Sequence, residues 1–169
     1  LHLRQSGNSS GVTMLIRPCA ERDMPQLLEI WLQATLHEHD YLPVAGWWPK
    51  EEAMRRKLQD EAQIWVVAEE RGAETELTPL SESQPVVGFV ATREDQLLAI
   101  YVHPAYQRRG LGSLLMTLAK EQHAQLRLSV CSRNEEAVQF YLQQGFAICG
   151  EHYRDDEQCD EYLMQYPIS

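Results

Sequence analysis

Two hydrophobic periods divide the chain into helices and strands. Apolar residues recur every three or four positions in predicted helices at 23–37, 111–123 and 134–145. A further helix is expected at 49–60, opening at Pro49, with mixed charges that indicate a solvated face. Short β-prone runs, some alternating and some continuously apolar, predict strands at 14–17, 64–68, 86–92, 97–102, 126–131, 146–153 and 159–166. The resulting order is β-α-α-β-β-β-α-β-α-β-β, which predicts an α/β (α+β) fold built on one mixed sheet without an internal repeat.

Local signals refine the place of several strands in this sheet. The run at 97–102 is apolar on both faces, so we expect it at the centre of the sheet. The run at 14–17 is stopped by Pro18 and is expected at an edge. Gly88 interrupts a strand, which indicates a bulge or a close approach of another backbone. The polar connection at 69–85 is too long for a tight hairpin, and we expect a mobile surface loop there rather than a site.

Length and charge limit the function classes. A chain of 169 residues that is 44% hydrophobic suits one compact domain, expected at 14–169 after a flexible or vector-derived segment at 1–13. Lys and Arg number 15 against 25 Asp and Glu, which gives a formal net charge of −10. Generic binding to nucleic acid or to an anionic membrane needs clustered cations, so we expect neither as a partner. Any bound anion must therefore be held by a local site.

The cysteine and histidine spacings argue against a metal site. No two cysteines form a C-x-x-C pair: they are Cys19, Cys131, Cys149 and Cys159. We interpret them as reduced thiols of a cytoplasmic protein. His37 and His39 stand two positions apart in an irregular segment with no third ligand in view. We therefore expect that the protein binds no metal.

A glycine-spaced turn within residues 102–113 carries the clearest chemical signal. It precedes an amphipathic helix, whose first N–H groups are unpaired and carry partial positive charge. Gly110 and Gly112 remove side chains where a backbone must approach a ligand closely. Arg108 and Arg109 add fixed positive charge in a chain that is acidic overall. The turn is therefore predicted to hold phosphate.

Two segments carry a resemblance to a known family. Residues 107–112, which read Gln-Arg-Arg-Gly-Leu-Gly, resemble the Q/R-x-x-G-x-G/A coenzyme A signature of the GNAT superfamily of N-acetyltransferases. Residues 134–146 are similar to the family's N-x-x-A-x-x-x-Y-x-x-x-G-F segment, and the two segments have the expected separation. The resemblance implies a single GNAT-like domain with a central mixed, mostly antiparallel sheet flanked by helices. The connection at 69–85 is longer than the compact hairpin of the family.

The resemblance also implies how acetyl-CoA is bound. Backbone N–H groups of the signature turn would hold the pyrophosphate, with the Ser113 hydroxyl as a further donor. The strand at 100–102 would pair with the pantetheine arm if the strand at 126–131 splays away, and the Val102 N–H would face the thioester oxygen. Asn134 would either contact the coenzyme or only cap its helix. The implied coenzyme-binding residues are Ile100, Tyr101, Val102, Gln107, Arg108, Arg109, Gly110, Leu111, Gly112, Ser113 and Asn134.

Tyr141 resembles the general acid of the family. A phenol with a reference pKa near 10 stays protonated at neutral pH and can donate its proton to the departing sulfur. The alternative is a tyrosine that only packs an amphipathic helix against the core. Its place seven residues after Asn134 and four before Gly145 favours the catalytic role.

The spacing leaves the general base open. The candidates, each able to act through a water molecule, are His37, Glu38, His39, His103 and Glu151. We favour His39, because the family usually builds its acceptor pocket in the irregular segment at 37–48. That segment could equally be a loop whose aromatic rings cover the core. A covalent acetyl-cysteine step at Cys131 is a less favoured alternative to direct transfer.

Two functions of different class follow from these residues. The first is an acetyl-CoA-dependent N-acetyltransferase, in which a primary amine of a small molecule or protein attacks directly in a ternary complex. The second is a non-catalytic acyl-CoA-binding or sensing module of the same fold. The sequence identifies no particular amine acceptor, and its apolar residues do not decide between a monomer and a homodimer.

Overall fold

The described residues fold around one sheet of eight strands. In the computed structural model, the described residues are 2–4, 13–38, 47–71, 75–79, 81, 84–155 and 158–167. The strands are β1 (His2–Arg4), β2 (Thr13–Pro18), β3 (Gln63–Glu70), β4 (Val86–Arg93), β5 (Gln96–Val102), β6 (Leu126–Cys131), β7 (Ala147–Arg154) and β8 (Cys159–Tyr166). The helices are α1 (Met24–Glu38), α2 (Trp47–Gln59), α4 (Leu111–Gln122) and α5 (Glu135–Gln143), with 3-10 turns η1 (Glu21–Asp23) and η3 (Pro104–Tyr106).

The strand order across the sheet is β1-β2-β3-β4-β5-β6-β8-β7. Neighbours are antiparallel except for β5 and β6, so the predicted mixed, mostly antiparallel sheet is confirmed, as is the central place of β5. The edge position predicted for residues 14–17 is wrong, because β1 pairs with the outer side of β2. Pro18 does not prevent this pairing, since it is the last residue of β2 and lies beyond the segment that β1 covers.

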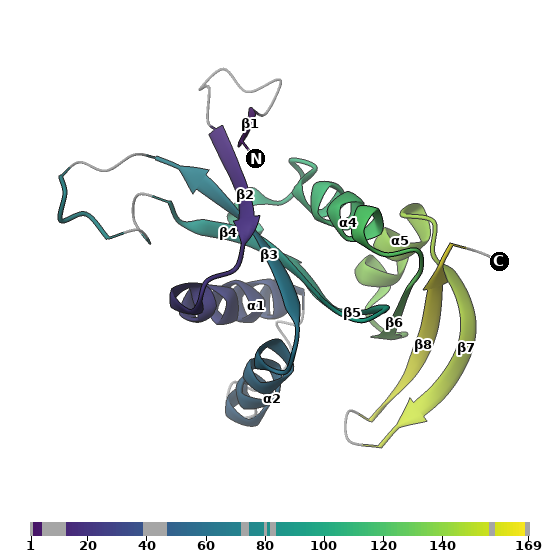
Figure 1. The fold of residues 1–169 in the computed structure, drawn as a ribbon. Helices are drawn as coiled ribbons and strands as arrows, with labels where there is room; N and C mark the ends of the chain where they lie inside the picture. The colour runs from purple at the N-terminus through teal and green to yellow at the C-terminus, as the bar shows by residue number, and fades with distance from the viewer. Residues whose placement is uncertain are drawn as a thin grey trace.

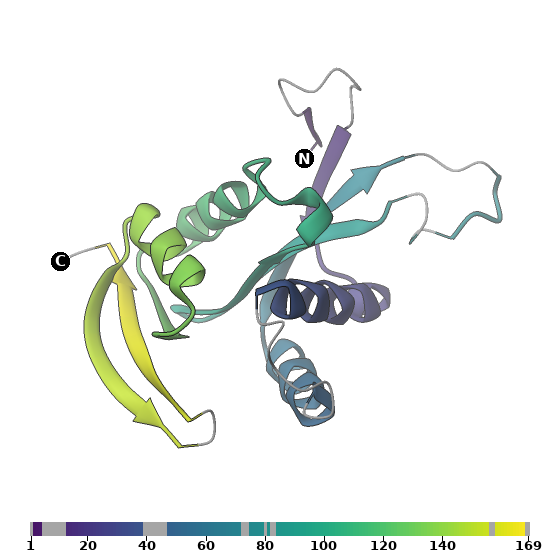
Figure 2. The ribbon, with the colours of Figure 1, turned by 180° about the vertical axis from the view of Figure 1, so that it is seen from behind.

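Helices cover both faces of the sheet. Figures 1 and 2 show α1 and α2 on one face and α4 with α5 on the other. Buried Leu27 and Leu58 pack with Phe89 on the first face, while Leu115 and Val138 belong to the core on the second. The helices α1, α4 and α5 therefore bury the apolar stripes that their sequence periodicity predicted, and α2 buries Leu58.

The parallel strands β5 and β6 separate soon after they begin. They are joined by the pair Gln96↔Arg127, and the Arg127 N–H donates to the carbonyl of Asp95 at 2.8 Å. Beyond that point β6 pairs along its length with β8, whereas β5 pairs with β4. The splay of the strand at 126–131, which was the condition for pairing of the pantetheine arm, is present and leaves an opening between the two central strands.

Gly88 lies where α4 packs against β4. The β3–β4 register shifts between the pairs Val67↔Gly88 and Ala68↔Val86. A Cβ on Gly88 would lie 3.2 Å from the Tyr101 carbonyl oxygen and 3.3 Å from a methyl carbon of Leu115. Both predictions for this glycine, a bulge and a close approach, are therefore confirmed.

Candidate active site

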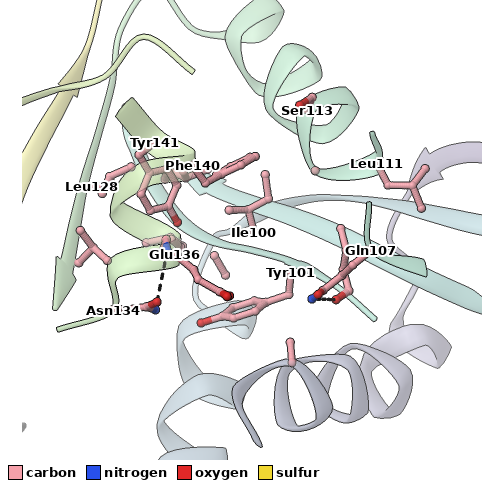
Figure 3. Close-up of a pocket in the computed structure, with 18 of the residues that line it drawn as sticks. Ile100, Tyr101, Gln107, Leu111, Ser113, Leu128, Asn134, Glu136, Phe140 and Tyr141 are labelled. Carbon is pink, nitrogen blue, oxygen red and sulfur yellow. Dashed lines mark hydrogen bonds between the residues drawn. The ribbon is translucent and has the colours of Figure 1, made fainter. Parts of the chain in front are cut away.

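A pocket of about 510 Å³ occupies the opening between β5 and β6 (Figure 3). Its walls come from β5, β6, the turn before α4 and the first turns of α5, with contributions from α1 and α2. The sequence-predicted residues that line it are Ile100, Tyr101, Val102, Gln107, Arg108, Gly110, Leu111, Gly112, Ser113, Asn134 and Tyr141. Residues that are distant along the chain are thus brought to one cavity.

The edge of β5 that faces away from β4 presents backbone groups to this pocket. The His103 N–H donates to the Val87 carbonyl at 2.8 Å, toward β4. Successive residues of a strand direct their backbone groups to opposite edges, so the N–H groups of Val102 and Ile100 point away from β4. They face the opening that β6 vacates. A strand-like ligand could therefore hydrogen-bond there.

The turn before α4 has an unusual backbone. Arg108 and Gly110 both adopt left-handed conformations, with φ of 65° and 78°. Left-handed residues within such a turn direct successive N–H groups toward one concave side, an arrangement that binds anions. For Arg108 this conformation costs about 1–2 kcal/mol, because its Cβ crowds the following carbonyl. Sequence reasoning found the glycines but had no signal for the left-handed arginine. The turn could therefore hold an anion.

The start of α4 lies against α5. A Cβ on Gly112 would be 3.3 Å from Cε1 of Phe140. The Gln144 side-chain amide donates to Oγ of Ser113 at 3.0 Å, which leaves the Ser113 hydroxyl proton able to point elsewhere. These contacts link the turn at 108–113, called the phosphate turn below, to the helix that carries Tyr141.

The Gln107 side chain ties the phosphate turn to β5. Its Nε2 donates to the Val102 carbonyl oxygen at 3.2 Å (Figure 3). This oxygen points into the opening, as the Val102 N–H does, and Gln107 satisfies it there. The contact therefore fixes the end of β5 relative to the turn that follows.

A polar cluster supports Arg109 beside the turn. The Arg109 guanidinium carbon lies 5.1 Å from the centre of the Tyr106 ring, within the range of a cation–π contact. The Tyr106 hydroxyl donates to Glu69, and Arg71 donates to that hydroxyl at 2.8 Å. Arg71 also pairs with Glu69 at 3.2 Å. Arg109 does not line the pocket, but its neighbours Arg108 and Gly110 do. The cluster therefore holds the Arg109 side chain beside the pocket.

Glu69, the first residue of the 69–85 connection, belongs to this cluster. Burial alone would raise the pKa of Glu69, but hydrogen bonds from Tyr106 and Arg71 and the charges of Arg71 and Arg109 lower it overall. Burial, reinforced by the Glu69 contact, raises the pKa of the Tyr106 phenol. The sequence predicts that no part of the 69–85 connection belongs to the site. This is wrong for its first residue, Glu69, which lies near the end of β3 and supports the turn before α4 through Tyr106.

Replacing Tyr106 with phenylalanine tests this support. The ring would remain under Arg109, but the hydroxyl that joins Glu69 and Arg71 would be lost. The hydroxyl bonds two charged groups, and hydrogen bonds to charged groups contribute about 1.5–3 kcal/mol to stability. We expect about 1 kcal/mol of this to reach the turn, so the dissociation constant for acetyl-CoA should rise about fivefold while kcat at saturation stays unchanged. Titration calorimetry and steady-state kinetics measure the two quantities. A fall in kcat at saturating acetyl-CoA would contradict a purely positioning role.

Tyr141 is held by aromatic neighbours on α5 and beyond it. Its ring lies 5.5 Å from that of Phe140 and 5.8 Å from that of Phe146, both edge-to-face. The side chain is half-buried, and Figure 3 shows its hydroxyl directed into the pocket. Asn134 begins the helix, and its side-chain oxygen accepts a hydrogen bond from the Ala137 N–H at 3.3 Å. Of its two predicted roles the structure shows the cap, and coenzyme contact stays a prediction.

The candidate bases are distributed unevenly. His103 uses Nδ1 to accept a hydrogen bond from the Ala105 N–H at 3.1 Å, and neither it nor exposed Glu151 lines the pocket. His39 and the side chains of His37 and Glu38 lie outside the described residues. The acid that does line the pocket is Glu136, which sequence reasoning did not select. Its only sequence signal was its place in the first turn of the helix that carries Tyr141.

The cysteines are free thiols, and Cys131 lines the pocket. Burial would raise the pKa of Cys131, but a hydrogen bond from Cys159 and interactions with Arg133 lower it overall. Burial raises the pKa of Cys159 to about 11. Among the described residues, no three His, Cys, Asp or Glu side chains gather as a metal site would require.

Comparison with known proteins identifies the family. Residues 60–148 match the family described as "Acetyltransferase (GNAT) domain". The chain belongs to the GNAT acetyltransferases. The peptidyl-lysine N-acetyltransferase YiaC of Escherichia coli K12 is 30% identical over 155 residues, which cover 91% of this chain and 97% of that protein. The peptidyl-lysine N-acetyltransferase YjaB of the same strain is 29% identical over 141 residues, which cover 83% of this chain and 87% of that protein.

Solved structures of GNAT proteins share the fold. The solution structure of apo YjaB from E. coli matches with a TM-score of 0.71 at 25% identity, covering 90% of this chain and 97% of that one. The PaiA N-acetyltransferase of Thermoplasma acidophilum, solved with coenzyme A, matches with a TM-score of 0.63 at 16% identity, covering 92% and 99%. This GNAT chain is therefore an acetyl-CoA-dependent N-acetyltransferase that acts on an amine, which favours the enzyme over the sensing module. None of its described helices is long and apolar enough to cross a membrane.

Proposed function

We propose that this GNAT enzyme acetylates lysine side chains of proteins in the cytoplasm, by direct attack of the amine in a ternary complex. The observation that supports direct attack most strongly is the pocket between β5 and β6. It joins the phosphate turn and Tyr141 to a second region lined by Ala34 and Met54 of α1 and α2. The lysine acceptor is supported by the names of the two E. coli relatives. No nucleic acid or membrane is part of the proposal.

The proposed binding roles follow the geometry of the chain's own groups. Acetyl-CoA supplies the acetyl group as a thioester. The concave turn at 108–113 would hold its diphosphate, and Arg108 and Arg109 would add charge. The free N–H groups of Ile100 and Val102 would pair with the pantetheine arm and with the thioester oxygen.

Two proton positions define the proposed chemistry. The amine must be neutral to attack, and the departing sulfur must be neutralised. The Tyr141 hydroxyl would donate to this sulfur, while the Val102 N–H would stabilise negative charge as it develops on the acyl oxygen. Since Val102 and Tyr141 both line the same pocket, direct attack needs no covalent step at Cys131.

A panel of acceptors tests the proposed substrate class. Purified protein with acetyl-CoA would be given a peptide with one internal lysine, the same peptide with only a free N-terminus, and a polyamine. We expect release of free thiol and addition of one acetyl group at the lysine, detected by a thiol reagent and mass spectrometry. Acetylation of the polyamine alone would replace protein lysine with a small-molecule acceptor. Coenzyme binding without transfer to any amine would instead support the sensing module.

A further inference from the structure

Glu136 stands out among the residues that line the pocket. It is the only acid among the described lining residues, beside the basic Lys57 and Arg108. Figure 3 shows its side chain directed into the pocket, as are the side chains of Tyr101 and Tyr141. The helix that carries Tyr141 therefore also brings a carboxylate to the same cavity.

The Glu136 carboxylate differs in its partners from the two buried acids of the described residues, Asp23 and Glu161. Buried Glu161 pairs with His152 at 3.1 Å and with Arg154 at 3.2 Å. Buried Asp23 accepts two hydrogen bonds from Arg17, at 2.6 and 2.9 Å. Across the described part of the chain, no hydrogen bond or ion pair engages the Glu136 carboxylate. This acid is exposed and able to accept a cation that enters the pocket.

The neighbouring Glu135 supplies a natural comparison. Both acids occupy the first turn of α5, where each interacts favourably with the positive end of the helix dipole. Consecutive helical residues point about 100° apart, because 3.6 residues make one turn. Glu135 is exposed and does not line the pocket. Only Glu136 is therefore placed to meet a ligand.

We propose that Glu136 binds the ammonium group of the acceptor and takes the proton that the amine must lose before it attacks. This inference rests on the proposed acetyl transfer to lysine, and it makes Glu136 a specificity-determining group for cationic amines. Lysine arrives protonated at neutral pH, since its reference pKa is about 10.4. A carboxylate within the pocket both attracts that cation and offers a site for its proton.

The proposed transfer releases one proton in total. The ammonium loses one proton to Glu136, which passes it to solvent. The neutral amine forms the new C–N bond, the C–S bond breaks, and the sulfur takes the proton of Tyr141. The second proton that the nitrogen loses restores Tyr141 through water. The net products are the acetylated amine, the free thiol of coenzyme A and one released proton.

The decisive comparison is Glu136→Gln against Glu135→Gln. Both variants remove one negative charge from the same helical turn, so general effects on charge and helix stability are matched. The first readout is the affinity of the coenzyme A-saturated protein for a lysine peptide and for the same peptide with norleucine in place of lysine. Norleucine keeps the aliphatic chain and lacks the ammonium. The second readout is kcat/KM for the lysine peptide over a range of pH.

We expect Glu136→Gln to weaken binding of the lysine peptide about 10- to 100-fold, the range for a charged hydrogen bond. Norleucine binding and acetyl-CoA affinity should not change, and Glu135→Gln should behave like the wild type. The kcat/KM of Glu136→Gln should rise more steeply with pH than that of the wild type, because the variant depends on lysine that is already neutral. Glu136→Asp should restore part of the affinity. Equal lysine affinity in the two glutamine variants would overturn the proposal.

The two readouts separate this inference from the proposed function. If the wild-type protein bound the lysine peptide through Glu136 without acetylating it, the proposed transferase function would be wrong and the cation site would stand. If Glu136→Gln acetylated the lysine peptide with unchanged rate and affinity, the proposed function would stand and the proposed role of Glu136 would be wrong. Wild-type protein that neither binds nor acetylates any lysine peptide would overturn both.

Discussion

Replacing Tyr141 with phenylalanine is expected to lower kcat by about 10²- to 10⁴-fold, the usual contribution of a positioned general acid. The substitution removes one oxygen and keeps the ring, whose edge-to-face contacts with Phe140 and Phe146 hold it in place. The fold and the phosphate turn should therefore be unaffected. Acetyl-CoA affinity should stay close to that of the wild type.

Tyr153→Phe is a suitable control for this prediction. Tyr153 is 57% exposed on β7 and does not line the pocket, so removing its hydroxyl should leave the rate unchanged. Pre-steady-state measurement of thiol release would separate the transfer step from product release. Equal transfer rates for Tyr141→Phe and the wild type would remove Tyr141 from the mechanism and leave it a packing residue.

Gly112→Val should produce the largest loss of coenzyme binding. Even a bare Cβ at this position would lie 3.3 Å from the Phe140 ring, and the branched side chain of valine needs more space. Overpacking of this kind costs about 1–3 kcal/mol. Either the Phe140 ring or the start of α4 must shift to relieve the strain, and a shift of α4 takes its N–H groups out of position. The dissociation constant for acetyl-CoA should rise about 10- to 100-fold by the same energy range.

Gly110→Ala provides the matched comparison. A Cβ at Gly110 meets no atom within 4 Å, so its cost is backbone strain at a φ of 78° rather than a collision. The expected loss is about 1 kcal/mol of folding stability, with a smaller effect on coenzyme affinity. Calorimetry and the thermal shift produced by increasing acetyl-CoA measure both variants. Greater weakening by Gly110→Ala than by Gly112→Val would show that the α4–α5 contact does not control binding.

The sequence predicted most of the architecture because local periodicity and the two glycine-bearing segments agree. Leu126 to Cys131 alternates as a half-buried strand, and β6 has the matching alternation of burial. The helix stop at Gly145 follows from its left-handed φ of 95°. The pairing of His2–Arg4 with β2 was not predictable, because three residues without a marked pattern reveal a partner only in the folded chain.

The candidate site was predictable in part for the same reason. The phosphate turn and Tyr141 belong to continuous segments, so their spacing identified them. Glu69 and Glu136 could not be recognised in this way, because their significance depends on contacts with distant parts of the chain. The proposed base His39 lies outside the described residues, so its role stays a prediction.

The early separation of β5 from β6 has a consequence for the enzyme without its co-substrate. An unpaired strand edge usually lies at the rim of a sheet, where it can recruit other chains. Here the unpaired edge lies inside the sheet, between segments that continue on both sides. The two halves of the sheet are thus joined by few backbone bonds until a ligand fills the space. Acetyl-CoA would then act as a missing strand, so the cell's supply of it would help to set the stability of the enzyme as well as its rate.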